Sequence, residues 1–228
     1  MENLRYKKIK SFILTVDGKS SSGKSTAAKL LSRKFQIPHL SSGLLYRWGA
    51  KKIIDKKPKN KVSYLRKCFK RFDYKKIKKI NLHKPDISKY SAIIAKTLAV
   101  RKIIKKTQKT WVKQNKKYCV IEGRDSHLIF PNALVKFYLK ANLNTAALRR
   151  FRELKKKNRK ITFKEVKNDL KRRDYSDTTR KHSPLILAKD HVVIRSDILN
   201  KSQMIKKMSE MVGKKLKKKY GFGNKFRK

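Results

Sequence analysis

The apolar positions of the chain predict short strands that alternate with amphipathic helices. Runs of apolar residues rich in β-branched and aromatic side chains predict strands at 12–16, 118–122, 134–139 and 191–194, and 38–40 can hold only a short strand. Apolar residues three or four positions apart predict helices at 24–35, 42–54, 86–98, 100–115, 143–157, 162–173 and 201–219. Because strands and helices alternate, the pattern indicates an α/β fold, a five-stranded parallel sheet flanked by helices on both faces.

The length of 228 residues fits a single domain, 1–228, that carries insertions. The pattern changes at 55–84, where lysines are frequent and aliphatic residues are few, so we expect a small, mobile, basic insertion there. We also expect a basic tail at 214–228. The residues Thr162 and Glu165 form a capping-box pattern, which marks the start of one predicted helix.

Charge changes this picture only in part. Lysine and arginine together number 66 and acidic residues 15, which gives a formal charge of +51. Such an excess attracts polyanions, and we expect nonspecific nucleic-acid affinity at low salt. The basic residues are spread over the whole chain, however, so the charge alone does not indicate a nucleic-acid recognition site.

The cysteines and the N-terminal residues predict the compartment. Cys68 and Cys119 lie far apart, without the spacing of a zinc site, and this usage fits a reducing cytoplasm. The first apolar run is too short to span a membrane and leads directly into a glycine-rich loop, so we interpret it as a strand rather than a signal peptide. We therefore expect a cytoplasmic protein without membrane contacts, and a monomer because no clear exposed apolar stripe is visible.

The stretch "DGKSSSGKST" at 17–26 has the spacing of a phosphate-binding P-loop, with Gly18 followed after four residues by Gly23-Lys24-Ser25. Glycines let successive backbone N–H groups point inward, and the following helix N-terminus favours anions. Lys24 would reach the β- and γ-phosphates, and Ser25 would hold Mg²⁺. Asp17 has two open interpretations, either holding a metal-bound water or shaping the turn.

Four further motifs narrow the reaction: "SSGLLYR" at 41–47, "VR" at 100–101, "EGRD" at 122–125 and "RRDYSDTTRKHSPL" at 172–185. In this order and at these separations the chain resembles the bacterial cytidylate kinase family, P-loop kinases that phosphorylate CMP and dCMP. The resemblance covers residues 12–212. It implies an acceptor-binding part at 41–98, which includes the insertion, and a lid region at 149–180 that closes over ATP.

The resemblance also implies roles for individual residues, with ATP and Mg²⁺ as cofactors. ATP would be bound by Arg150 of the lid and by the loop residues Gly18, Lys19, Ser20, Ser21, Ser22, Gly23, Lys24, Ser25 and Thr26. The catalytic cations would be Lys24, Arg124, Arg173 and Arg180. The acceptor would be held by Ser42, Tyr46, Arg47, Arg101, Arg124, Asp125, Arg173, Asp177 and Arg180, with Arg101 and Asp125 reading cytosine and Asp177 holding the sugar.

Several positions depart from the family pattern. The departures are Lys19 and Ser21 in the loop, Ser41 where the family has Asp, His83 and Ser176 where it has Arg, and Ala92 where it has a base-contacting Ser. The loop after Asp125 is also one residue short. None of these departures removes a residue of the phosphate-transfer site, whereas several concern acceptor recognition, so they affect the predicted cytosine specificity more than the predicted kinase activity.

The reaction that follows is transfer of the ATP γ-phosphate to CMP or dCMP. Two alternatives remain. One is a P-loop kinase for another nucleoside monophosphate or a small alcohol. The other is a basic RNA-binding protein with a degenerate P-loop, although the chain lacks the aromatic and loop signatures of common RNA-binding modules.

Overall fold

A single parallel sheet organises the molecule. The computed structural model describes residues 11–156 and 160–221. Five strands pair in the order β2-β3-β1-β4-β5, and every pairing is parallel. They are β1 (Phe12–Gly18), β2 (His39–Ser41), β3 (Tyr118–Glu122), β4 (Val135–Lys140) and β5 (His191–Arg195). The predicted α/β class and five-stranded parallel sheet are therefore confirmed.

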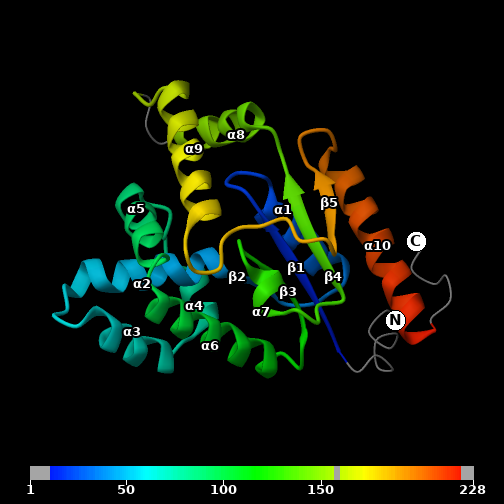
Figure 1. Ribbon diagram of the computed structural model, residues 1–228, viewed down its shortest axis with the longest axis horizontal. Coiled ribbons are helices and arrows are strands. Elements are labelled where there is room, and N and C mark those ends of the chain that lie inside the picture. The colour runs from blue at the N-terminus through cyan, green and yellow to red at the C-terminus, as the bar shows by residue number, and fades with distance from the viewer. Residues whose placement is uncertain (1–10, 157–159, 222–228) are drawn as a thin grey trace.

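Helices cover both faces of the sheet (Figure 1). They are α1 (Lys24–Lys34), α2 (Ser42–Lys56), α3 (Lys61–Lys70), α4 (Tyr74–Lys78), α5 (Pro85–Ile94), α6 (Leu98–Gln114), α7 (Ser126–Ile129), α8 (Leu143–Lys155), α9 (Phe163–Thr179) and α10 (Lys201–Tyr220). On β3, Val120 packs with α1 and α10, whereas Cys119 and Ile121 pack with α2 to α7. This division follows the strand period of two, which sends successive side chains to opposite faces.

The segment 55–84, expected to be a small, mobile, basic insertion, contains two helices that the sequence pattern did not predict. It forms α3 and α4, and its apolar side chains Leu65, Phe69, Tyr74, Ile77 and Leu82 are buried in the core beside α2 and α6. The basic residues face outward on the same helices. A few well-spaced apolar residues are therefore enough to attach the segment to the helical layer that contains α2 and α6.

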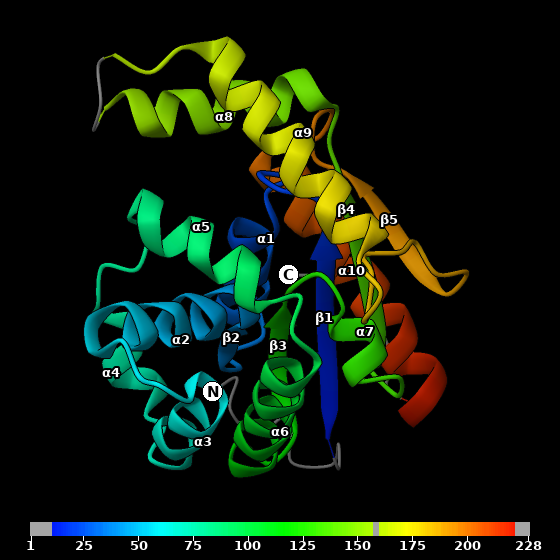
Figure 2. The ribbon, with the colours of Figure 1, turned by 60° about the vertical axis from the view of Figure 1, so that its left-hand side comes forward.

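Helices α8 and α9 pack against each other and extend beyond the sheet (Figure 2). The predicted capping box at Thr162 and Glu165 is confirmed, and Thr162 Oγ1 accepts from Glu165 N. The helix that was expected to end at residue 173 continues to Thr179, because neither proline nor glycine interrupts 163–179. The helix predicted at 143–157 ends at Lys155, and the predicted last residue, 157, lies outside the described residues.

The C-terminal ends of β1 and β3 lie side by side. Val16 pairs with Glu122, so the P-loop that follows β1 and the "EGRD" segment that ends β3 share one rim, as expected. The predicted basic tail is helical as far as Tyr220, and 222–228 lie outside the described residues. None of the described helices is long and apolar enough to span a membrane.

Candidate active site

The P-loop connects β1 to α1 in a backbone conformation that needs glycine at its start. Gly18 has φ of 147°, and a Cβ there would lie 2.3 Å from the carbonyl oxygen of Leu139 on β4. Ser196, directly after β5, donates from Oγ to the carbonyl of Ser22 at 2.7 Å. The loop is thus held from two neighbouring strands. It contains the predicted ATP-binding residues Gly18, Lys19, Ser20, Ser21, Ser22, Gly23, Lys24, Ser25 and Thr26.

Lys24 is buried inside this loop and donates to the carbonyl of Lys19. Burial lowers the pKa of Lys24 well below its ordinary value, and the nearby Arg124 lowers it further. A buried ammonium beside a guanidinium is stabilised when an anion enters between them. The position therefore suits the phosphates of a nucleotide.

Ser25 and Glu122 supply oxygen atoms at the edge of the P-loop. Ser25 donates from Oγ to Glu122 Oε1 at 3.0 Å, while the buried Oε2 of Glu122 has no protein partner among the described residues. Burial raises the pKa of Glu122, but His39 and the hydroxyls of Ser41 and Ser25 outweigh it and hold the pKa at about 2. An ionised carboxylate beside a hydroxyl suits Mg²⁺, which prefers oxygen ligands. The sequence assigned no role to Glu122, although its place at the end of a buried strand was a signal.

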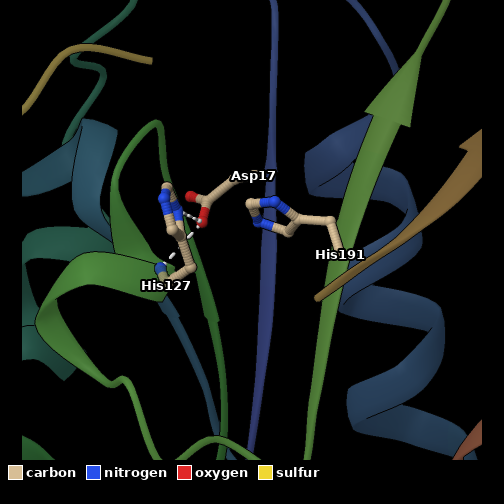
Figure 3. A group of neighbouring side chains, drawn as sticks. All are labelled: Asp17, His127 and His191. Carbon is tan, nitrogen blue, oxygen red and sulfur yellow. Dashed lines mark hydrogen bonds and ion pairs between the residues drawn. The ribbon is translucent and has the colours of Figure 1, made fainter. Parts of the chain in front are cut away.

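Asp17 anchors the segment after "EGRD" (Figure 3). Its Oδ1 accepts from Ser126 N at 2.9 Å, and its Oδ2 accepts from His127 N at 2.9 Å and lies 3.0 Å from His127 Nδ1. Of the two interpretations of Asp17, the structure favours shaping the turn, because the buried carboxylate is engaged by these groups. Sequence reasoning did not find this link, which joins residues distant in the chain.

Asp17, His127 and His191 also place ligand-type atoms within 4.8 Å of one another (Figure 3). The hydrogen bonds do not suit a metal, however. His191 Nδ1 accepts from the backbone N–H of Ala188 at 2.8 Å, so the neutral ring carries its proton on Nε2. A ligating histidine usually donates from the nitrogen that does not bind the metal, which is the opposite arrangement.

A chain of charged hydrogen bonds joins the P-loop to α9. Arg124 donates from Nη2 to Ser20 Oγ at 3.0 Å and from Nε to Asp177 Oδ2 at 2.9 Å. Arg180 donates from Nη1 to Asp177 Oδ1 at 2.9 Å. In addition, Ser20 N donates to Asp174 Oδ1 at 2.8 Å. The structure thus brings together the predicted catalytic and sugar-binding residues of β3 and α9.

Further arginines converge on the same space. Burial lowers the pKa of Arg47 to about 10, and the nearby Arg173, Arg124 and Arg150 contribute to the shift. The Nε of Arg47 is buried without a protein partner among the described residues. Arg150 also forms an ion pair on α8, in which its Nη1 donates to Glu153 Oε2 at 2.8 Å. A half-buried cluster of guanidinium groups that disfavour one another's charge is a site for a polyanion such as phosphate groups.

The predicted base-reading pair lies beside this cluster. Arg101 donates from Nη2 to Asp125 Oδ2 and from Nη1 to the carbonyl of Ala95 at 2.9 Å, and each side of the pair is 5% exposed. The Tyr46 ring centroid lies 5.8 Å from Cζ of Arg101. Ser42 is buried with an Oγ that has no protein partner among the described residues. These predicted acceptor residues are therefore assembled in one region.

The residues at which the sequence departs from the family pattern differ in burial and in hydrogen bonding. Ser91, the neighbour of Ala92, donates its hydroxyl to the carbonyl of Ser88 at 2.8 Å and is buried. It therefore does not replace the hydroxyl that Ala92 lacks. His83 is exposed, and Ser176 lies half-buried on α9 beside Asp177.

Three features define the class of protein. Strand β1 leads into a P-loop, a cluster of arginines faces that loop, and the helices α8 and α9 pack together beyond the sheet. This arrangement is that of a phosphotransferase of the nucleoside monophosphate kinase type. Comparison with known proteins gives the family. The cytidylate kinase family model matches residues 14–214, and the chain belongs to this family.

Individual relatives agree over nearly their whole length. A cytidylate kinase of Mycoplasmoides gallisepticum is 32% identical over 92% of this chain and 97% of its own. A cytidylate kinase of Bartonella tribocorum is 32% identical over 83% of this chain and 89% of its own. Among solved structures, an uncharacterized protein of Eubacterium ventriosum matches with a TM-score of 0.49 and 13% identity, over 89% of this chain and 99% of its own.

Proposed function

We propose that this protein transfers the γ-phosphate of ATP to CMP or dCMP, giving ADP and the cytidine diphosphate. The observation that carries the proposal is the network Ser20–Arg124–Asp177–Arg180, which joins the donor loop to the acceptor residues. It adjoins a cluster of guanidinium groups in which Arg47, Arg124, Arg150 and Arg173 outnumber the nearby carboxylates, and burial and the positive charge around Arg47 lower its pKa. Such a space suits two phosphate-bearing substrates bound end to end.

The residues act by positioning and by charge. Backbone N–H groups of the P-loop and Lys24 hold the ATP phosphates, while Arg47, Arg124 and Arg173 orient the acceptor phosphate. An acceptor phosphate oxygen attacks the γ-phosphorus in line and the β–γ bridging bond breaks, leaving ADP. No general base is needed, because the acceptor phosphate is already ionised. When bound, Mg²⁺ supplies charge neutralisation, and Ser25 and Glu122 are the residues that would hold it.

The acceptor base is assigned from the buried pair Arg101 and Asp125. Arg101 offers hydrogen-bond donors and Asp125 offers a hydrogen-bond acceptor. Together they are complementary to the edge of a pyrimidine base that carries both an acceptor and a donor. Asp177 accepts from Arg124 and Arg180 and would also accept from a sugar hydroxyl. The names of the relatives support the same acceptor class.

The proposal is tested by ADP release from ATP and Mg²⁺ with CMP, dCMP, UMP, AMP, GMP or no acceptor. We expect turnover with CMP or dCMP, lowered at least about 10³-fold in Lys24→Ala. Lys29→Ala, which removes an exposed lysine of α1, is the matched control and should behave as wild type. Turnover with UMP or AMP instead would keep the kinase and overturn the cytosine assignment. No turnover with any of these acceptors would sink the proposal and favour the RNA-binding alternative.

A further inference from the structure

A cavity of about 450 Å³ lies between the C-terminal half of α9 and the connection from α5 to α6. Figure 2 shows these two parts of the chain facing each other beside the sheet rim. The lining residues are Lys96, Tyr175, Ser176, Thr179, Arg180, Lys181 and His182. None of them is acidic. The volume and the mixture of an aromatic ring, hydroxyls and cations suit a small anionic molecule with a flat ring.

The cavity adjoins the acceptor residues on both sides. Arg180 lines it while donating to Asp177, and its buried Nη2 has no protein partner among the described residues. Lys96 follows Ala95, whose carbonyl accepts from Arg101 of the base-reading pair. The cavity therefore lies at the end of the Ser20–Arg124–Asp177–Arg180 network that is remote from the P-loop.

We propose that this cavity receives the nucleoside part of the pyrimidine acceptor, with Tyr175 stacking on the base and Lys96 donating to an oxygen of the nucleoside. The proposal rests on the proposed function and adds two residues to its acceptor site. Neither residue was among the site residues that the family resemblance implies.

The surroundings of Tyr175 support a role in binding. Tyr175 is 70% exposed, although it lies within the C-terminal half of α9 and lines the cavity. An exposed aromatic ring contributes little to a core, but its face is available to a nucleobase. Base–aromatic stacking typically changes affinity by at least about fivefold on alanine substitution.

Lys96 offers a hydrogen-bond donor at the cavity. The hydroxyl expected at position 92 is absent because the residue is alanine, and the Ser91 hydroxyl is engaged by Ser88. Lys96 is exposed at the cavity and its ammonium can only donate. A pyrimidine carbonyl oxygen or a sugar hydroxyl is the partner that matches it, and both belong to the nucleoside.

The test is calorimetric binding of CMP and of ribose 5-phosphate to the full chain, with steady-state kinetics alongside. The variants are Tyr175→Ala, Tyr175→Phe and Lys96→Met. The matched control is Lys102→Met, which removes an exposed lysine of α6 outside the cavity. We expect Tyr175→Ala and Lys96→Met to weaken CMP binding and to raise the KM for CMP at least about fivefold. The KM for ATP and the kcat should stay within about twofold. Tyr175→Phe and Lys102→Met should match wild type.

The outcomes separate the two levels of the proposal. If wild type binds CMP and both cavity variants bind it equally well, the cavity is not the nucleoside site and the proposed function stands. If both variants lose the same factor for ribose 5-phosphate as for CMP, the cavity acts on the phosphate and the stacking assignment is overturned. If wild type binds CMP but turns over no acceptor, the proposed function fails while a loss in the variants still supports the cavity. If wild type does not bind CMP at all, both fail.

Discussion

Arg124 donates from Nε to Asp177 Oδ2 at 2.9 Å, so a residue that follows β3 is joined directly to the C-terminal turn of α9. Asp177 also accepts from Arg180, and burial raises its pKa while Arg124, Arg180 and Arg173 lower it more strongly. The carboxylate therefore stays ionised and sets the positions of two guanidinium groups. This relationship is the geometric centre of the proposed site.

Replacing Asp177 by Asn should lower kcat/KM for CMP by about 100-fold, because charge-assisted hydrogen bonds to Arg124 and Arg180 are weakened together. Asp169→Asn is the matched control. Asp169 lies on the same helix and pairs with Arg172, but it is largely exposed. Steady-state kinetics of both variants check the prediction, and an equal loss in Asp169→Asn would contradict it.

Gly18→Ala should destabilise the fold by more than about 2 kcal/mol, because the new Cβ meets the backbone of Leu139 in a conformation that glycine favours. Gly213→Ala on α10 provides the opposite case, since a Cβ there meets nothing within 4 Å. It should stabilise the protein by up to about 1 kcal/mol. Urea unfolding measures both changes, and a neutral Gly18→Ala would show that the P-loop can shift away from β4.

Glu122 should make stability depend on acid pH. Its folded pKa of about 2 lies below the ordinary value of 4.5, so its contribution is present above pH 4.5 and is lost as the pH falls toward 2. The full contribution is on the order of 3 kcal/mol. The stability difference between wild type and Glu122→Gln should therefore shrink between pH 5 and pH 3 in urea unfolding. Glu210→Gln, an exposed change on α10, is the control variant measured alongside. A pH-independent difference for Glu122→Gln would refute this assignment.

The charge of +51 should produce nucleic-acid affinity that salt removes. Counterion release predicts that binding of an unstructured RNA weakens by at least about 10³-fold between 50 and 200 mM salt. Fluorescence anisotropy of a labelled RNA measures the effect. Affinity that survives in 200 mM salt would require a built site and would strengthen the RNA-binding alternative.

The sequence was sufficient for the sheet and for the parts of the site that are local in the chain. The P-loop is defined by spacing within ten residues, and the strands by compact apolar runs, so both could be predicted. The cluster of Arg47, Arg124 and Arg173 was assigned only through the order of several motifs. Local pattern alone does not distinguish these arginines from the many surface cations of a chain this basic.

Other features depend on contacts between distant residues. The helices at 61–70 and 74–78 were missed because their apolar residues are sparse, and only packing against α2 and α6 makes Leu65 and Phe69 part of a core. The link from Asp17 to His127 joins the ends of two strands, and no local signal indicates it. The cavity beside Tyr175 arises between α9 and the segment after α5, and it exists only in the folded chain.

Helix α9 contacts both halves of the proposed site, since Asp174 accepts from the P-loop backbone at Ser20 while Asp177, which accepts from Arg180, is proposed to hold the acceptor. A nucleotide that displaces Asp174 from the P-loop must therefore change the free energy of the groups that hold the other substrate. Thermodynamic linkage makes this effect reciprocal. We expect the factor by which bound ATP alters CMP affinity to equal the factor by which bound CMP alters ATP affinity. Helix α9 would then couple the binding of the two substrates.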